Sequence, residues 1–107
     1  MLDALAKADS PAAKYITKYF RRPVMINYLW DELAAAAWID PTIITGERNV
    51  YMDVDTQKGP TYGDTLTWED RFHPQTGLQK VHAQLDLDLP KFQKMFITLM
   101  SAPPQTP

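Results

Sequence analysis

The sequence predicts an α/β fold, in which helices precede Pro41 and a β-hairpin, a further strand and a final helix follow it. Three observations predict this order. Apolar residues before Pro41 recur at helical spacing, residues 50–55 and 80–88 alternate apolar with polar side chains, and helical spacing returns after Pro90. The 107 residues, 45% of them hydrophobic, are enough for at most one ordinary globular domain.

The composition excludes several classes of protein. The chain has no cysteine, which excludes disulfides and thiolate metal sites. Its 11 basic and 13 acidic residues form no long runs, so they provide no electrostatic footprint for nucleic acid or an anionic membrane. No segment has the length of a transmembrane helix, and the N-terminus lacks a basic region followed by an apolar stretch. We expect a soluble, cytoplasmic protein without a nucleic-acid or membrane partner.

The N-terminal part is expected to be helical. Residues 1–9 suggest a short helical piece, and Ser10 followed by Pro11 is a typical helix start. The next helix has an apolar stripe at i, i+4 spacing, as a buried face would have. That stripe consists of Tyr15, Ile16, Tyr19 and Phe20. Residues 23–28 are either more helix or an irregular connection.

The central element is a helix expected within residues 28–41, which read YLWDELAAAAWIDP. Asn27 is a candidate N-cap, which would place Trp30 and Asp31 in the first turn. Alanine has the highest helix propensity and little bulk, so this helix could pack closely against a neighbouring sheet. The helix should end before Pro41, because a residue that precedes proline is pushed out of the helical region.

Strands are expected after the central helix. Residues 50–55 alternate as a half-buried strand does, and residues 57–60 supply a turn into a second strand over residues 61–68. Gly63 within that second strand indicates a bulge or a close backbone approach. Residues 69–78, which contain proline and glycine, are expected to form an exposed loop.

The last part of the chain is expected to contain a strand, a helix and a tail. Residues 80–88 alternate again, Asp88 suits a helix N-cap, and Pro90 opens the final helix. The apolar stripe of that helix consists of Phe92, Met95, Phe96, Leu99 and Met100. Residues 101–107 are Pro-rich and are expected to form a flexible tail.

Three segments in this order carry a resemblance to a known family: WDELAAAAWIDPTIIT, VYMDVDTQKGPTYGDTLTW and KVHAQLDLDLPKFQKMFITLM. They contain an aromatic residue followed by Asp, an Ala-rich helix ending in Asp-Pro, a V-D-V strand, a T-x-G-x-T strand and a late strand that leads into a final helix. Residues 28–99 thus resemble the C-terminal portion of the inosine–uridine-preferring nucleoside hydrolase family. The Asp-rich metal-binding motif near the N-terminus of that family has no counterpart in this chain.

The resemblance implies that residues 1–107 are one partial domain, whose elements normally pack on a larger mixed sheet. The family hydrolyses the N-glycosidic bond of nucleosides to ribose and free base. It uses a Ca²⁺ held by several aspartates, and this ion accepts about six to eight oxygen ligands. Asp31 matches the metal-binding aspartate of the C-terminal part. The other ligands and the general base would lie upstream of Met1. The resemblance therefore assigns no catalytic residue here, and the chain alone is expected to be inactive and not to hold Ca²⁺.

The resemblance also implies substrate-binding residues. Trp30 stands where many family members have histidine; its indole cannot supply a proton but can stack on a purine, as in purine-specific members. Tyr15 and Tyr19 could line the mouth of the pocket. Each assignment has a simpler alternative. Trp30 could fill the core, the two tyrosines could be a packing stripe, and Asp31 could only complement the helix dipole.

The remaining polar candidates have structural explanations. His73 lies in a loop and is expected to be solvated, and His82 is expected to be a structural histidine on a strand face. Asp53 and Asp55 resemble the V-D-V strand of the family, although alternate carboxylates on an exposed face need no metal. The same applies to Asp86.

Two classes of function follow. The first is a piece of a purine-type nucleoside hydrolase, and the alternative is a non-enzymatic interaction or oligomerisation module that reuses this part of the fold. An unrelated α+β domain is a third interpretation. In the first two, faces that the family covers with other elements would be exposed, and exposed apolar patches mark interfaces. We therefore expect self-association, or a complementary N-terminal segment as a partner.

Overall fold

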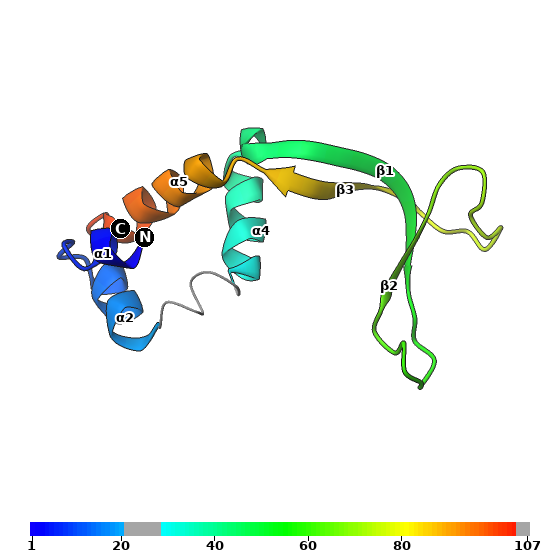
Figure 1. The fold of residues 1–107 in the computed structure, drawn as a ribbon, viewed down its shortest axis with the longest axis horizontal. Helices are drawn as coiled ribbons and strands as arrows, with labels where there is room; N and C mark the ends of the chain where they lie inside the picture. Colours follow the sequence, from blue (N-terminus) through cyan, green and yellow to red (C-terminus); the bar gives the residue numbers. More distant parts are fainter. Residues whose placement is uncertain (21–28, 105–107) are drawn as a thin grey trace. The chain divides into compact units, whose positions relative to one another are not determined.

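A computed structural model describes residues 1–20 and 29–104, which form two compact units (Figure 1). Unit 1 comprises Met1–Ile44 and Leu87–Pro107, and unit 2 comprises Thr45–Asp86. The helices belong to unit 1 and the sheet is centred in unit 2. The mixed α and β content expected from the sequence is therefore confirmed.

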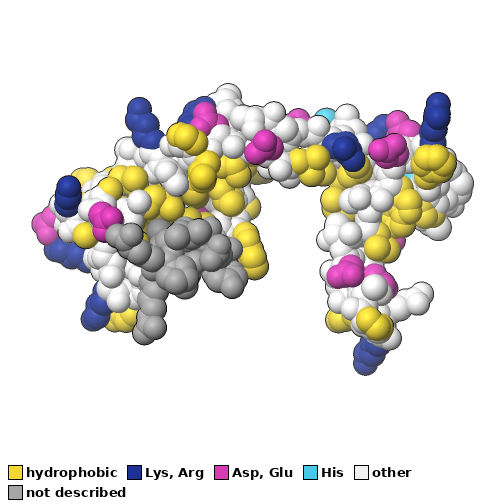
Figure 2. Space-filling view, viewed as in Figure 1, with side chains coloured by type: hydrophobic (Ala, Val, Ile, Leu, Met, Phe, Trp, Pro, Cys, Tyr) yellow, Lys and Arg dark blue, Asp and Glu magenta, His cyan; other side chains and the backbone are white. Residues whose placement is uncertain are grey.

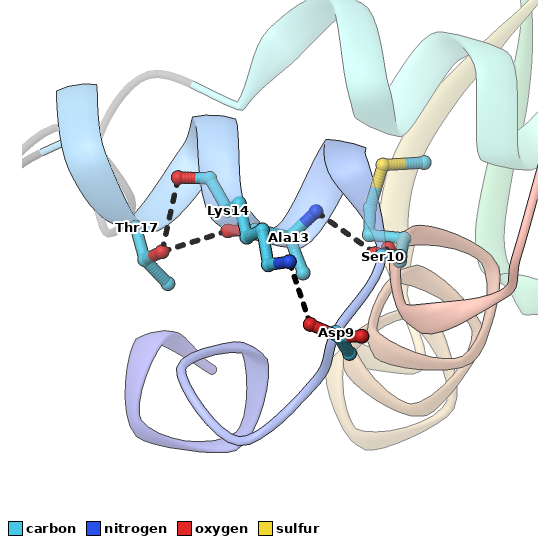
Figure 3. A network of polar contacts seen from close by, with 6 residues as sticks. Asp9, Ser10, Ala13, Lys14 and Thr17 are labelled. Carbon is cyan, nitrogen blue, oxygen red and sulfur yellow. Dashed lines mark hydrogen bonds and ion pairs between the residues drawn. The ribbon is translucent and has the colours of Figure 1, made fainter.

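The N-terminal part of unit 1 contains α1 (Leu2–Leu5) and α2 (Pro11–Tyr19). The expected cap of α2 is confirmed, because the Ser10 hydroxyl oxygen accepts a hydrogen bond from the Ala13 amide at 3.0 Å (Figure 3). The buried Ser10 hydroxyl also donates to the carbonyl oxygen of Met100 near the other end of the chain. One side chain thus starts α2 and connects it to the C-terminal helix.

The buried face of α2 differs from the predicted stripe. Ala13 is fully buried, and Ile16 and Phe20 pack against the core. Tyr15 and Tyr19 instead remain 61% and 58% exposed, with their ring centroids 4.7 Å apart. The prediction that the tyrosines belong to a buried stripe is wrong for this unit, because the close contact of α2 is made at the small alanine.

Unit 1 is organised around α5 (Leu89–Ser101), which contacts α1, α2, α4 (Trp30–Ile39) and the short 3-10 helix η1 (Pro41–Ile43). Phe92 and Phe96 of α5 are 1% and 8% exposed, and their ring centroids lie 6.0 Å apart. The other buried core residues are Leu5, Ala13, Leu29, Ala36 and Ile43. The central element is therefore the last helix and not the Ala-rich one. In this unit α4 packs against α5 and η1, where we expected a sheet.

The boundaries of α5 agree closely with the prediction. The Asp88 carboxylate accepts a hydrogen bond from the Lys91 amide at 2.9 Å, which confirms it as the N-cap. Met95 and Met100 of the predicted stripe pack against the core, whereas Leu99 is 46% exposed. The helix includes Ser101, so the non-helical end starts one residue later than expected. Residues 105–107 of the predicted tail lie outside the described residues.

Asp40 connects the end of α4 to the start of α5. The helix ends at Ile39, as Pro41 predicts. The Asp40 carboxylate accepts hydrogen bonds from the Thr42 amide at 3.0 Å and from the Thr42 hydroxyl at 2.5 Å. Lys91 Nζ lies 3.0 Å from the other carboxylate oxygen and also donates to the Thr42 hydroxyl oxygen. These hydrogen bonds lower the pKa of Asp40 below its usual value. The Thr42 hydroxyl has the largest effect, and Lys91 has the next largest.

This lowered pKa predicts a pH dependence of stability. A carboxyl group with a lower pKa in the folded state stabilises the fold above its unfolded pKa, and this contribution disappears as the pH falls through the folded pKa. Because the unperturbed value is 3.8, Asp40 should contribute fully above about pH 5 and lose its contribution progressively as the pH falls below 3.8 towards the lower folded-state pKa. Urea unfolding of the wild type and of Asp40→Asn between pH 7 and 3 measures this. The difference in unfolding free energy should shrink towards low pH, and a constant difference would contradict the assignment.

The sheet has the strand order β2-β1-β3, with β1 at Ile44–Val54, β2 at Thr65–Trp68 and β3 at Lys80–Leu87. The predicted hairpin is confirmed, since β1 and β2 pair antiparallel with Tyr51 opposite Trp68. β1 begins at Ile44 and not at residue 50, and β2 begins at Thr65 and not at residue 61. The third predicted strand is confirmed as β3, and the loop over residues 69–78 separates it from β2.

Gly63 lies in the turn between β1 and β2, so the predicted strand bulge is wrong. Its φ is +90°, a backbone conformation that is strongly unfavourable for residues with a Cβ atom. Its amide donates to the Asp55 carbonyl oxygen at 2.8 Å. The Asp55 carboxylate accepts from the Thr61 hydroxyl at 2.6 Å and the Gln57 amide at 2.9 Å. The turn is therefore closed by one aspartate and one glycine.

Gly63→Ala should destabilise the hairpin by about 1 kcal/mol or more, because alanine pays a steric cost at positive φ. A Cβ added at Gly63 would have no atom within 4 Å, so a steric clash with neighbouring residues is not expected. The variant therefore tests the cost of the backbone conformation alone. Gly59→Ala is the matched control in the same turn, because Gly59 has no positive φ. Thermal or urea unfolding checks the difference, and equal losses from both variants would contradict this account.

Candidate functional site

Trp30 and Asp31 are the first two residues of α4, so their predicted place in the first helical turn is confirmed. The N-cap is Leu29, which provides no side-chain cap hydrogen bond but is buried at 7% exposure. The helix therefore starts at a residue that is held by the core. The predicted cap Asn27 lies outside the described residues.

Both side chains of this pair are directed away from the unit 1 core. Trp30 is 69% exposed and Asp31 is exposed, so in this structure Trp30 does not fill the core. Asp31 and Glu32 place two carboxylates in the first turn, where negative charge complements the positive end of the helix dipole. An indole and a carboxylate are thus consecutive side chains at a helix start, next to a buried leucine in the sequence.

The whole of α4 is unusually apolar for an exposed helix. After Glu32 its sequence is LAAAAWI, and only Ala36 is buried. Trp38 and Ile39 are 89% and 62% exposed, and Figure 2 shows hydrophobic side chains at the surface of both units. A helix that is apolar all round is normally surrounded by protein. The described residues of this chain cover only one side of α4.

Tyr15 and Tyr19 form an aromatic pair on α2, with Lys18 Nζ 5.0 Å from the centroid of the Tyr19 ring. Exposed, mutually packed aromatic rings are suited to contact with a flat ligand or with another protein surface. The structure thus brings Tyr15 and Tyr19 into contact, whereas Trp30 and Asp31 are consecutive residues of α4. Both pairs belong to unit 1.

The carboxylates of the described residues do not form a metal site. Within residues 1–20 and 29–104, no group of three or more His, Asp or Glu side chains could hold a metal ion. One carboxylate such as that of Asp31 supplies at most two of the about six to eight oxygens that Ca²⁺ requires. The residues described here therefore do not fit a calcium site by themselves.

Two further aspartates bind the backbone of unit 2. Asp53 accepts a hydrogen bond from the Val54 amide at 2.8 Å. Hydrogen bonds lower the pKa of Asp55, and the bond from the Thr61 hydroxyl has a larger effect than the bond from the Gln57 amide. These contacts support the prediction that the alternating carboxylates need no metal to explain them.

Unit 2 contains an aromatic and charged cluster that the sequence analysis missed. The His73 ring stacks on the Tyr51 ring, with centroids 3.8 Å apart and planes 8° apart. Its Nδ1 lies 2.9 Å from the carbonyl oxygen of Asp70. Lys80 Nζ lies 2.7 Å and 2.9 Å from the two carboxylate oxygens of Asp70 and 5.8 Å from the centroid of the Tyr51 ring. His73 was expected to be solvated, and it is half-buried with one ring face stacked on Tyr51.

This cluster fixes the loop over residues 69–78 to the sheet face that carries Tyr51. The pKa of Lys80 is raised, and the hydrogen bond to Asp70 is the largest of the effects that raise it. The charged ammonium form of Lys80 is therefore favoured. The polar contacts described above join members of the cluster to one another. The cluster is therefore explained by a structural role, which is to hold the loop against the sheet. No local sequence signal could reveal it, because the stacked residues lie on different elements. The second histidine, His82, is exposed on β3.

No family model matches this chain, and a search of curated proteins gave no match. Among the described residues, no helix combines the length and apolar character needed to cross a bilayer.

Proposed function

We propose that this chain is the C-terminal part of a Ca²⁺-dependent nucleoside hydrolase of the purine-specific type, located in the cytoplasm and inactive by itself. One observation carries the proposal: α4 is apolar on nearly all sides yet exposed, and it begins with adjacent Trp30 and Asp31. An apolar helix of this kind is stable when further elements surround it. In the proposed complete enzyme, the elements of this chain pack on a larger mixed sheet, which covers α4 and forms a pocket at its first turn.

Each predicted site residue has a role in that pocket. Asp31 is one of several carboxylates that hold Ca²⁺, and the ion, when bound, positions the ribose hydroxyls and acidifies a water. Trp30 offers its indole face to the purine, and stacking needs no proton transfer. Tyr15 and Tyr19 form an aromatic surface at the mouth. The general base and the other metal ligands belong to a segment outside this sequence.

A second candidate is a non-enzymatic interaction or oligomerisation module. The exposed aromatic and aliphatic side chains favour it, because Trp38, Phe72 and Leu85 are 89%, 74% and 63% exposed in the absence of any partner. Exposed apolar side chains that gather into a patch mark sites of protein association. Under this interpretation Asp31 only complements the helix dipole, and no nucleoside binds.

The genomic sequence upstream of the Met1 codon separates the two candidates. An in-frame segment rich in aspartate would support the enzyme, and the extended protein should then hydrolyse inosine, guanosine or adenosine only with Ca²⁺ present. The 107-residue chain should show no hydrolysis, since one carboxylate cannot hold the ion and no base accompanies it. Turnover by the purified short chain, or an extended protein that never needs Ca²⁺, would contradict the proposal.

A further inference from the structure

The sheet of unit 2 lacks a core of its own. Val50 is the one hydrophobic residue of unit 2 among the buried core residues of the chain. Val54, Leu66 and Leu85 on its three strands are 48%, 39% and 63% exposed. A sheet is stable when one of its faces is covered by another layer or when the sheet is extended. Unit 2 therefore has surface to bury against a partner.

The sheet has two edge strands, β2 and β3, and β3 is the longer of the two. The strand order β2-β1-β3 leaves one side of β3 unpaired within the sheet. Its eight residues, KVHAQLDL, include no proline or glycine, which are among the residues that interrupt pairing at natural edges. An edge strand of this length can pair with another strand through its backbone N–H and C=O groups.

The sequence of β3 is complementary to itself when two copies run antiparallel. With Ala83 of one copy opposite Ala83 of the other, Lys80 stands opposite Asp86 and Val81 opposite Leu85. His82 then stands opposite Gln84. Residues directly opposite in an antiparallel pair share a face and interact, and opposite charges there are favourable. The twofold symmetry produces each of these pairs twice.

Other registers lose this complementarity. If one strand slips by one residue, Val81 stands opposite Asp86. An aliphatic side chain then lies beside a carboxylate. Centring the pair on Gln84 moves the partner of Lys80 beyond the end of β3. Lys80 also contacts both carboxylate oxygens of Asp70, and because an ammonium group has three donors a second carboxylate can be accommodated.

We propose that β3 pairs antiparallel with β3 of a second copy of this chain, centred on Ala83, and that this joins two three-stranded sheets into one of six strands. The small Ala83 side chains meet at the twofold axis, and two Lys80–Asp86 pairs flank them. The pairing defines a self-association surface on unit 2. It does not depend on the proposed nucleoside hydrolase activity, because it uses none of the site residues of unit 1.

Charge exchange tests the register. The mass of the 107-residue chain, 12.2 kDa, should double in analytical ultracentrifugation at tens of micromolar. Lys80→Asp or Asp86→Lys creates two like-charge pairs, so each should raise the dimer dissociation constant by about 10- to 100-fold. The double variant Lys80→Asp/Asp86→Lys restores opposite charges and should restore the dimer. Circular dichroism checks folding, and Asp86→Lys avoids the contact between Lys80 and Asp70.

A disulfide provides an independent test, because the protein has no natural cysteine. Ala83→Cys should form an intermolecular disulfide under mild oxidation, since directly opposite Cα atoms lie about 4.5–5.5 Å apart. Gln84→Cys is the control, because its symmetry mate would lie about 8 Å away, beyond disulfide reach. A monomer at 100 μM, a dimer that ignores the charge variants, or cross-linking through Gln84→Cys instead of Ala83→Cys would overturn the proposal.

Discussion

Phe92→Ala is expected to lower the unfolding free energy of the chain by about 3–5 kcal/mol, the range for removing a buried aromatic side chain. Phe92 is 1% exposed at the centre of the unit 1 core. It lies on α5, the helix that contacts α1, α2, α4 and η1, so the cavity cannot be filled without moving several elements. Because small domains are only marginally stable, a loss of this size should leave unit 1 largely unfolded.

Urea unfolding followed by circular dichroism measures this effect. Leu99→Ala is the matched control on the same helix, since Leu99 is 46% exposed and its truncation should cost about 1 kcal/mol or less. If both variants lost the same stability, α5 would not be the organising element of unit 1. If Phe92→Ala lost nothing, the core described here would not exist in solution.

The helix boundaries could be predicted from the sequence because their signals are local. Ser10 and Asp88 each bind a backbone amide three residues ahead, and such N-caps require only a few consecutive residues. Pro41 ends α4 by restricting the residue before it. The placement of Trp30 and Asp31 in the first turn of α4 follows from the same local logic.

The buried surfaces could not be predicted in the same way. Periodicity identifies a stripe on α2 but not which part of it meets another helix, so Tyr15 and Tyr19 were expected inside and are exposed. Which element lies at the centre of the core also depends on contacts between distant segments. Ser10, which caps α2, and Met100 of α5 are joined by a hydrogen bond although they stand 90 positions apart in the sequence.

The extent of β1 was missed for a related reason. The residues before Val50 read ITGERN and do not alternate, so only the strand pairing reveals that they are extended. Gly46 provides one trace of that pairing, because a Cβ on it would lie 3.0 Å from the Cβ of Asp86. The stacking of His73 on Tyr51 likewise depends on the position of a loop against the sheet.

The second prediction with a large effect concerns Asp31 in the extended protein. Under the proposed function, Asp31→Ala removes a metal ligand and should abolish hydrolysis, because Ca²⁺ then lacks one of its carboxylates. The fold should change little, since the Asp31 side chain is exposed at a helix start. Thermal unfolding with and without Ca²⁺ checks the cause. Stabilisation by the ion should be present in the extended wild type and lost in the variant.

Trp30→Ala separates stacking from metal binding in the same protein. It should keep the stabilisation by Ca²⁺ but raise KM for purine nucleosides by about 5- to 150-fold, the equivalent of about 1–3 kcal/mol of lost stacking. If the indole binds ground state and transition state alike, kcat should change much less than KM. Pyrimidine nucleosides offer a smaller surface for stacking and should lose less. Equal losses on purine and pyrimidine substrates would mean that Trp30 only packs against neighbouring protein, and the purine preference proposed from it would be wrong.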